Sequence, residues 1–151
     1  MPKPSVRIRP IQRIAEKKEE NAARALGDAQ RALQAAQTRL NDLKNYYEIY
    51  QRQFQAAAAV GISTTQLQGY FAFLSRLDEA IQQQHQAVQD SEAERQRQME
   101  IWKGHHSYRQ SIDHLVERLR HEEFKADERR EQKESDEFGS RNAQRQTDEN
   151  S

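Results

Sequence analysis

Apolar residues recur every three or four positions along the first part of the chain. This spacing is the coiled-coil repeat, in which one stripe of a helix, here called the seam, faces a partner helix. We therefore expect a helix over residues 11–59. Its seam positions are Ile11, Ala15, Lys18, Ala22, Leu26, Ala29, Leu33, Ala36, Leu40, Leu43, Tyr47, Tyr50, Phe54 and Ala57.

A turn interrupts this stripe at residues 60–63. Gly61 can take the left-handed conformation that ends a helix, and Ser63 with Gln66 has the spacing of a capping box that begins another. Ile62 and Leu67 occupy the positions of a hydrophobic staple. A connection this short between two helices predicts an antiparallel pair.

The second helix is expected over residues 64–137, where the apolar stripe resumes. Folding the chain back near Gly61 pairs residues whose numbers sum to about 124, which places Phe54 opposite Tyr70 and Ile112 near Ile11. The middle of this stripe is polar, which predicts looser packing there. Its apolar members are Leu67, Tyr70, Leu74, Leu77, Ile81, Val88, Met99, Trp102, Ile112, Leu115 and Leu119, and its polar members are Gln84, Ser91 and Arg95.

The composition fits a thin structure with a single seam. Hydrophobic residues make up 34% of the chain and charged residues 32%, too few apolar side chains for a layered core. The predicted class is all-α: two long helices that form one antiparallel coiled-coil hairpin over residues 11–138. The strand signature of alternating β-branched residues is missing.

Both ends of the chain are expected to lie outside the hairpin. Residues 1–10 hold all three prolines and several basic residues, which predicts a flexible basic N-terminus. Residues 139–151 are rich in Ser, Asn, Gln and Asp, which predicts a disordered C-terminal tail.

Charge and cysteine content limit the possible functions. The 24 basic and 24 acidic side chains cancel, so the chain as a whole lacks the basic excess typical of nucleic-acid binders. The absence of cysteine fits a reducing compartment. Neither a membrane-spanning run nor the apolar core of a signal peptide is visible. We expect a cytoplasmic protein that does not bind nucleic acid or insert into a membrane.

No pattern indicates catalysis, a metal or a cofactor. The five histidines do not show the i, i+4 spacing with an acidic partner that a helical zinc site uses. Phosphate-binding loops and nucleophile elbows are absent too, and a two-helix hairpin offers no cleft that excludes water. We expect a protein that is not an enzyme and that binds other proteins.

Aromatic residues gather at the turn end of the predicted hairpin. The seam uses only Tyr47, Tyr50, Phe54 and Tyr70, which leaves Tyr46, Phe71 and Phe73 in surplus. A two-helix structure has no second layer to bury such residues. Exposed apolar patches usually mark a partner site, so we expect either a different protein or a second copy of the chain to bind here.

Several segments together resemble the FliJ family of flagellar export proteins. The opening residues 11–28, IQRIAEKKEENAARALGD, are similar to the family's start, and residues 40–50, LNDLKNYYEIY, to its Leu-rich approach to a Tyr-x-x-x-Tyr pair. The run Tyr70 to Leu74 resembles the start of the family's second helix, and residues 129–138, RREQKESDEF, its closing motif. The resemblance covers nearly the whole chain in order.

The resemblance implies a stalk-like component of the flagellar type III export apparatus. Family members seat the end carrying both termini in the export ATPase ring, and they contact the cytoplasmic domain of the export gate and escort chaperones of export substrates. The implied location is cytoplasmic, peripherally associated with the inner membrane at the apparatus. By position, the gate-binding residues are Leu43, Tyr46, Tyr50, Phe73, Leu77 and Ala80.

The sequence leaves three alternatives open. One is the equivalent stalk protein of a virulence-type injection apparatus, and another is a coiled-coil chaperone or scaffold without an ATPase partner. The third is an anionic-surface binder that uses the basic N-terminus, with Lys3, Arg7, Arg9 and Arg13.

Overall fold

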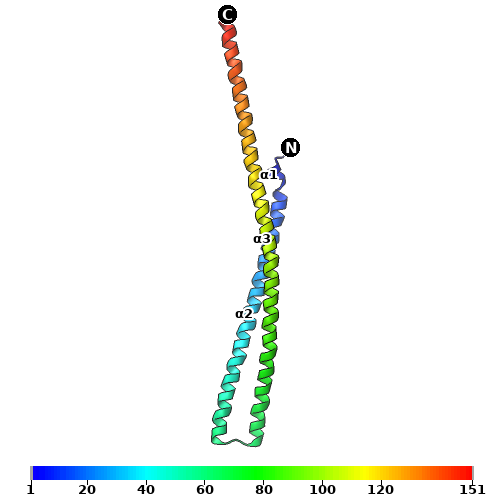
Figure 1. The fold of residues 1–151 in the computed structure, drawn as a ribbon, viewed down its shortest axis with the longest axis vertical. Coiled ribbons are helices and arrows are strands. Elements are labelled where there is room, and N and C mark those ends of the chain that lie inside the picture. The colour runs from blue at the N-terminus through cyan, green and yellow to red at the C-terminus, as the bar shows by residue number, and fades with distance from the viewer. Residues whose placement is uncertain (1, 151) are drawn as a thin grey trace. The chain divides into compact units, whose positions relative to one another are not determined.

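The computed structural model describes residues 2–150 and contains three helices (Figure 1). A short helix α1 (Pro4–Arg7) precedes two long ones, α2 (Arg9–Val60) and α3 (Thr64–Glu149), and the described residues contain no strand. The all-α prediction with two long helices is therefore confirmed. Over the residues that the structure describes, neither long helix carries an apolar stretch sufficient to cross a bilayer.

The helices contribute to two compact units. The terminal unit comprises residues 1–19 and 105–151, and the turn unit comprises residues 20–104. Each unit contains part of α2 and part of α3.

In the turn unit, the connection between α2 and α3 has the predicted chemistry. Gly61 has a φ of 108°, and its amide donates to the carbonyl of Ala57 at 3.1 Å. The Ser63 amide donates to Oε1 of Gln66 at 3.1 Å, and the Gln66 amide donates to Oγ of Ser63 at 3.2 Å. These two reciprocal bonds are a capping box, which satisfies two amides that a helix start leaves without partners.

The seam of the turn unit is made mainly of small and aliphatic residues. Its buried members are Ala22, Ala29, Leu33 and Leu40. Near the turn, the rings of Phe54 and Tyr70 meet edge to face with centroids 5.5 Å apart, as the predicted pairing requires. The polar seam residue Gln84 donates from Nε2 to the carbonyl of Ala36 at 3.0 Å, so its burial is compensated.

In the terminal unit, the seam differs from the prediction. Ile11 is 46% exposed and Lys18 is exposed, whereas Gln12 and Glu19 are partly buried beside the fully buried Ala15. The reason is the register. With Lys18 in the seam, the steps to Ala22 and from Ala22 to Leu26 would both be four residues, which breaks the heptad. The unbroken alternation of four and three passes through Gln12, Ala15, Glu19 and Ala22 instead.

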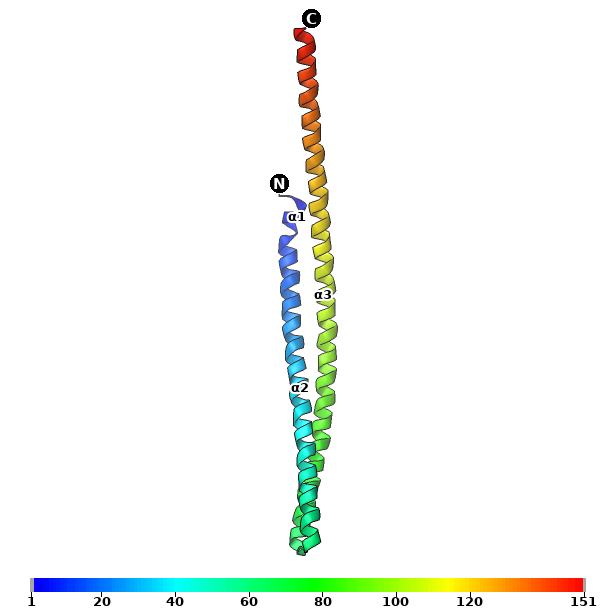
Figure 2. The same cartoon turned by 90° about the vertical axis from the view of Figure 1, so that its left-hand side faces the viewer.

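The N-terminus is ordered rather than flexible. Residues 4–7 form α1, which lies beside α3 within the terminal unit (Figure 2). Ser5 is buried and is held by two hydrogen bonds to Glu123 of α3. Pro4 suits this position because the first turn of a helix does not need its missing amide.

The C-terminal tail is helical rather than disordered. Helix α3 ends at Glu149 and not at residue 137, although every described residue after Asp127 is exposed. Local side-chain pairs along this segment, such as Gln132 with Asp136 at 3.3 Å, stabilise a helix without an apolar partner. No proline follows Pro10 to interrupt it.

Candidate protein-binding surfaces

The six residues predicted to bind the export gate occupy equivalent positions on α2 and α3 of the turn unit. In a heptad abcdefg whose seam positions are a and d, Leu43, Tyr50 and Leu77 are at d, and Tyr46, Phe73 and Ala80 are at the adjacent g. In an antiparallel pair the g rows of the two helices lie on the same side. The structure therefore brings the six together, and we call this set the aromatic face.

Ring contacts and exposure agree with this placement. The rings of Tyr50 and Phe73 are 4.1 Å apart between centroids, which joins the two helices across the aromatic face. Tyr46 is 56% exposed and Phe73 is 38% exposed, while the other four are half-buried. Large aromatic side chains that stay in water beside a seam have the character of binding hot spots.

Ile49 and Gly69 also belong to the surface near the turn, although neither was among the predicted binding residues. Ile49 is exposed and lies three residues after Tyr46, on the same side of α2. A shallow hollow beside Phe73 is lined by Tyr50, Gln66, Gly69, Tyr70 and Phe73. The sequence signal that could have identified Ile49 is its spacing of three residues from Tyr46. Gly69 contributes to the hollow because it leaves room that a larger side chain would fill.

Phe71 belongs to the opposite side of the turn unit. It is 54% exposed and occupies an e position, and its ring contacts Phe54 with centroids 5.4 Å apart. Its neighbours in the e rows include Lys44, Asp78 and His85. The surplus aromatics of the sequence therefore divide between a largely apolar side and a polar side.

In the terminal unit, an ionic cluster occupies the seam. The carboxylate of Glu19 accepts from Nη1 of Arg109 at 3.1 Å and lies 3.0 Å from Nδ1 of His106. Arg109 also places its buried Nε 3.6 Å from Asp113, to which Gln12 donates at 2.9 Å. The hydrogen bond with His106, together with Arg109, lowers the pKa of Glu19.

A second set of polar contacts holds the start of the chain against α3. The backbone amide and the hydroxyl of Ser5 donate to the two carboxylate oxygens of Glu123 at 2.9 and 2.7 Å. These bonds lower the pKa of Glu123. Nζ of Lys3 lies 2.9 Å from Asp127 and lowers the pKa of that carboxyl. A carboxylate that accepts such bonds is stabilised in its charged form.

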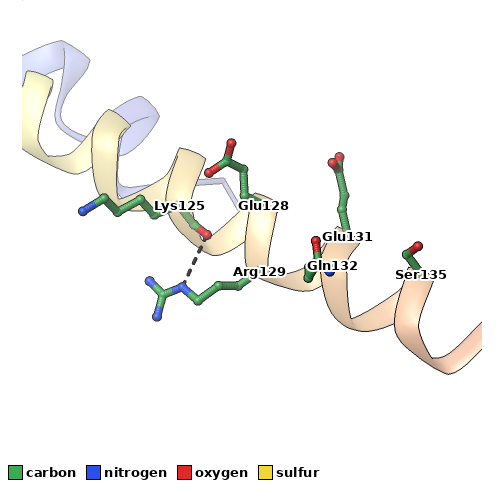
Figure 3. A pocket seen from close by; sticks show the side chains of 6 residues that line it. All are labelled: Lys125, Glu128, Arg129, Glu131, Gln132 and Ser135. Atoms are coloured by element: carbon green, nitrogen blue, oxygen red, sulfur yellow. Dashed lines mark hydrogen bonds between the residues drawn. The ribbon is translucent and has the colours of Figure 1, made fainter.

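The polar part of α3 from Lys125 to Ser135 carries a shallow hollow but no enclosed site. Figure 3 shows its lining side chains arranged along successive turns of α3 alone, with Arg129 Nε 3.4 Å from the carbonyl of Lys125. The lining residues are Lys125, Glu128, Arg129, Glu131, Gln132 and Ser135. Among the described residues, no group of three or more His, Asp or Glu side chains is placed to hold a metal ion.

Comparisons with known proteins settle the family. The family model described as "Flagellar FliJ protein" matches residues 4–148. The chain belongs to the FliJ family. It is 30% identical over 132 residues to the flagellar FliJ protein of Escherichia coli K12, a match that covers 87% of this chain and 90% of that one.

A second relative gives the same result. The flagellar FliJ protein of Salmonella typhi is 28% identical over 132 residues, with the same shares covered. No solved structure matched the chain significantly. Membership of the FliJ family makes the chain a flagellar export protein, as the resemblance of its motifs indicated.

Proposed function

We propose that this chain is a stalk-like coupling component of the flagellar type III export apparatus. In this proposal the terminal unit seats in the export ATPase ring, and the aromatic face of the turn unit binds the cytoplasmic domain of the export gate. The chain thereby couples ATP hydrolysis, performed by the ring, to export. It acts in the cytoplasm, peripherally at the inner membrane, and also contacts escort chaperones of export substrates.

The aromatic face is the observation that carries the proposal. Tyr46 and Phe73 remain exposed although the adjacent seam buries smaller aliphatic residues such as Leu40. Leaving such rings in water sacrifices apolar burial that a partner would recover. The FliJ family match supplies the flagellar export context in which that partner is sought.

The terminal unit supports the second half of the proposal through its chemistry. Its contacts between helices include ion pairs and charged hydrogen bonds, such as Glu19 with Arg109 and Lys3 with Asp127, beside the buried Ala15 and Val116. Beyond Asp127 the helix is exposed and carries both signs of charge. Charged surfaces of this kind suit a contact that forms and exchanges readily, because exposed ion pairs contribute little to stability individually.

The experiment is a binding titration of the purified gate cytoplasmic domain with matched aromatic variants. Tyr46→Ala with Phe73→Ala should weaken binding about tenfold or more, the range of hot-spot truncations. Phe71→Ala is the control, since Phe71 is similarly exposed but lies on the opposite side. Circular dichroism should show equal helicity in all variants.

Two results would argue against the proposal. Equal loss of binding by the Phe71→Ala control would show that the effect is not specific to the aromatic face. Unchanged binding by the double variant, together with an export ATPase whose rate does not respond to the chain, would instead favour a coiled-coil scaffold without an ATPase partner.

A further inference from the structure

The terminal unit has an exposed apolar surface that is separate from the aromatic face. In the register whose seam contains Ala15 and Glu19 of α2, and Arg109 and Val116 of α3, Ile11 and Ile14 are at g and c, and Tyr108 and Leu115 are at g. Val116, and not the predicted Leu115, is the buried seam residue. Ile11, Ile14 and Tyr108 are exposed and Leu115 is half-buried. We call these four residues the terminal apolar patch.

The ionic contacts of the terminal unit leave this side of the molecule uncovered. Gln12 and Glu19 are at a positions, and their partners Asp113 and His106 are at e positions of α3. The a and e rows lie on one side of an antiparallel pair, and the d and g rows on the other. The terminal apolar patch therefore lies on the side that the polar contacts do not use.

The spacing of the terminal apolar patch fits a third helix. Ile11 and Ile14 are three residues apart on α2, and Tyr108 and Leu115 are one heptad apart on α3. Two adjacent helices with apolar rows on the same side provide the surface against which another amphipathic helix packs. A partner helix would bury both rows at once.

Basic residues surround the terminal apolar patch. Lys18 follows Ile11 by one heptad, Arg7 precedes Ile14 by one heptad, and Arg118 lies at c beside Leu115. None of these three cations is in an ion pair within the residues that the structure describes. Glu122, one heptad beyond Leu115, is the one carboxylate in the c and g rows over residues 7–18 and 108–122.

We propose that the terminal apolar patch is a docking site for an amphipathic helix of another protein whose flanking residues are acidic. The excess of cations disfavours a second copy of this chain, because two such surfaces would place like charges together. The paired helical rows favour a helix over a membrane surface, which requires no such spacing. The proposal does not rest on the gate-binding role, which belongs to residues of the turn unit. It does not rest on the seating of the terminal unit in the ATPase ring either, because its test uses only the chain and peptides.

The test uses the full chain and fluorescent synthetic peptides of about four heptads, a length that supports helix formation. One peptide has leucine at its a and d positions and glutamate at its flanks, and its matched partner has lysine in place of every glutamate. We expect the acidic peptide to bind at least about tenfold more tightly than the basic one, because charge sign selects between partners of the same shape.

Two variants locate the binding. Ile14→Ser with Tyr108→Ser should weaken binding of the acidic peptide about tenfold or more, whereas Ile49→Ser in the turn unit, which also replaces an exposed isoleucine, should leave it unchanged. Lys18→Glu with Arg118→Glu should reverse the preference between the two peptides. The charge variant keeps the test informative even if the apolar variant loses helicity.

The following outcomes would overturn the proposal. They are equal binding of both peptides, loss of binding with Ile49→Ser alone, or a charge variant that keeps the original preference. Concentration-dependent dimerisation that Ile14→Ser with Tyr108→Ser abolishes would assign the patch to a second copy. Tighter binding to phosphatidylglycerol vesicles than to the acidic peptide, abolished by the same variant, would assign it to a lipid surface.

Discussion

The two units use the same pair of helices but different chemistry to hold them together. In the turn unit, aromatic rings meet across the seam, as Phe54 does with Tyr70. In the terminal unit, the buried apolar residues Ala15 and Val116 share the seam with polar contacts such as Glu19 to Arg109. Apolar side chains do not titrate and are not screened by ions, whereas charged contacts can be removed by acid or screened.

The difference also affects what each unit leaves exposed. The turn unit exposes aromatic side chains, which bury a large area when a partner binds. The terminal unit exposes basic residues around the terminal apolar patch, a combination that would suit partners of opposite charge. A single coiled-coil repeat therefore presents two exposed surfaces of different chemistry.

The largest expected effect comes from placing a charge in the seam of the terminal unit. Val116 is 2% exposed, so Val116→Asp would bury an unpaired carboxylate. Such a charge costs several kcal/mol, and we expect a loss of about 3 kcal/mol or more in unfolding free energy. Urea unfolding followed by circular dichroism measures this change.

The matched control is Val60→Asp, because Val60 is 91% exposed at the end of α2. It should change the unfolding free energy by less than about 0.5 kcal/mol. If the two variants were equally stable, Val116 would not lie in a seam, and the pairing of α2 with α3 in the terminal unit would be wrong.

The contacts of the terminal unit should depend on pH. Glu19, Glu123 and Asp127 all have pKa values below their ordinary 4.5, 4.5 and 3.8. A carboxyl whose folded pKa is depressed stabilises the folded state above its ordinary pKa, and this stabilisation is lost as the pH falls through the folded value. The terminal unit should therefore loosen as the pH falls below about 4.5.

Amide hydrogen exchange, corrected for the intrinsic pH dependence, measures this loosening. The Ser5 amide, which donates to Glu123, should lose protection in acid, while amides of α2 near Phe54 should keep theirs. Glu123→Gln is the matched variant and should make the protection of Ser5 less dependent on pH. Full protection of Ser5 well below the ordinary carboxyl pKa would contradict the prediction.

Local sequence patterns were sufficient to predict the turn and the helical class. The capping box between Ser63 and Gln66 depends on residues three apart, so its chemistry is visible in the sequence. Similarly, the heptad spacing predicted the pairing of Phe54 with Tyr70. The predicted binding residues share one side because their d and g positions follow from the same register.

Long-range partners explain what could not be predicted. Choosing apolar residues selected Ile11 for the seam, although the heptad spacing counted back from Leu26 leads to Glu19. The sequence could not show how a carboxylate is accommodated there, because its partners His106 and Arg109 come from α3. Ser5 is buried for the same reason, since Glu123 lies 118 residues away in sequence. Composition likewise suggested a disordered tail, but the segment after residue 138 is helical.

The smallest expected effect tests whether the turn is determined by backbone conformation. Gly61 has a φ of 108°, a region that residues with a Cβ rarely adopt, and no atom lies within 4 Å of a Cβ built there. Gly61→Ala should therefore destabilise the turn unit by about 1 kcal/mol through backbone strain alone. Urea unfolding followed by circular dichroism again measures the change.

Gly69→Ala is the matched comparison within the same unit. Gly69 lies inside α3 and also has open space around its built Cβ, so alanine should stabilise the helix by as much as about 1 kcal/mol. The two substitutions add the same methyl group. Changes of opposite sign in the unfolding free energy would therefore separate the effect of backbone conformation from the effect of packing. If both variants were stabilised, the turn could accept another conformation, and the direction in which α3 leaves the turn would not depend on Gly61.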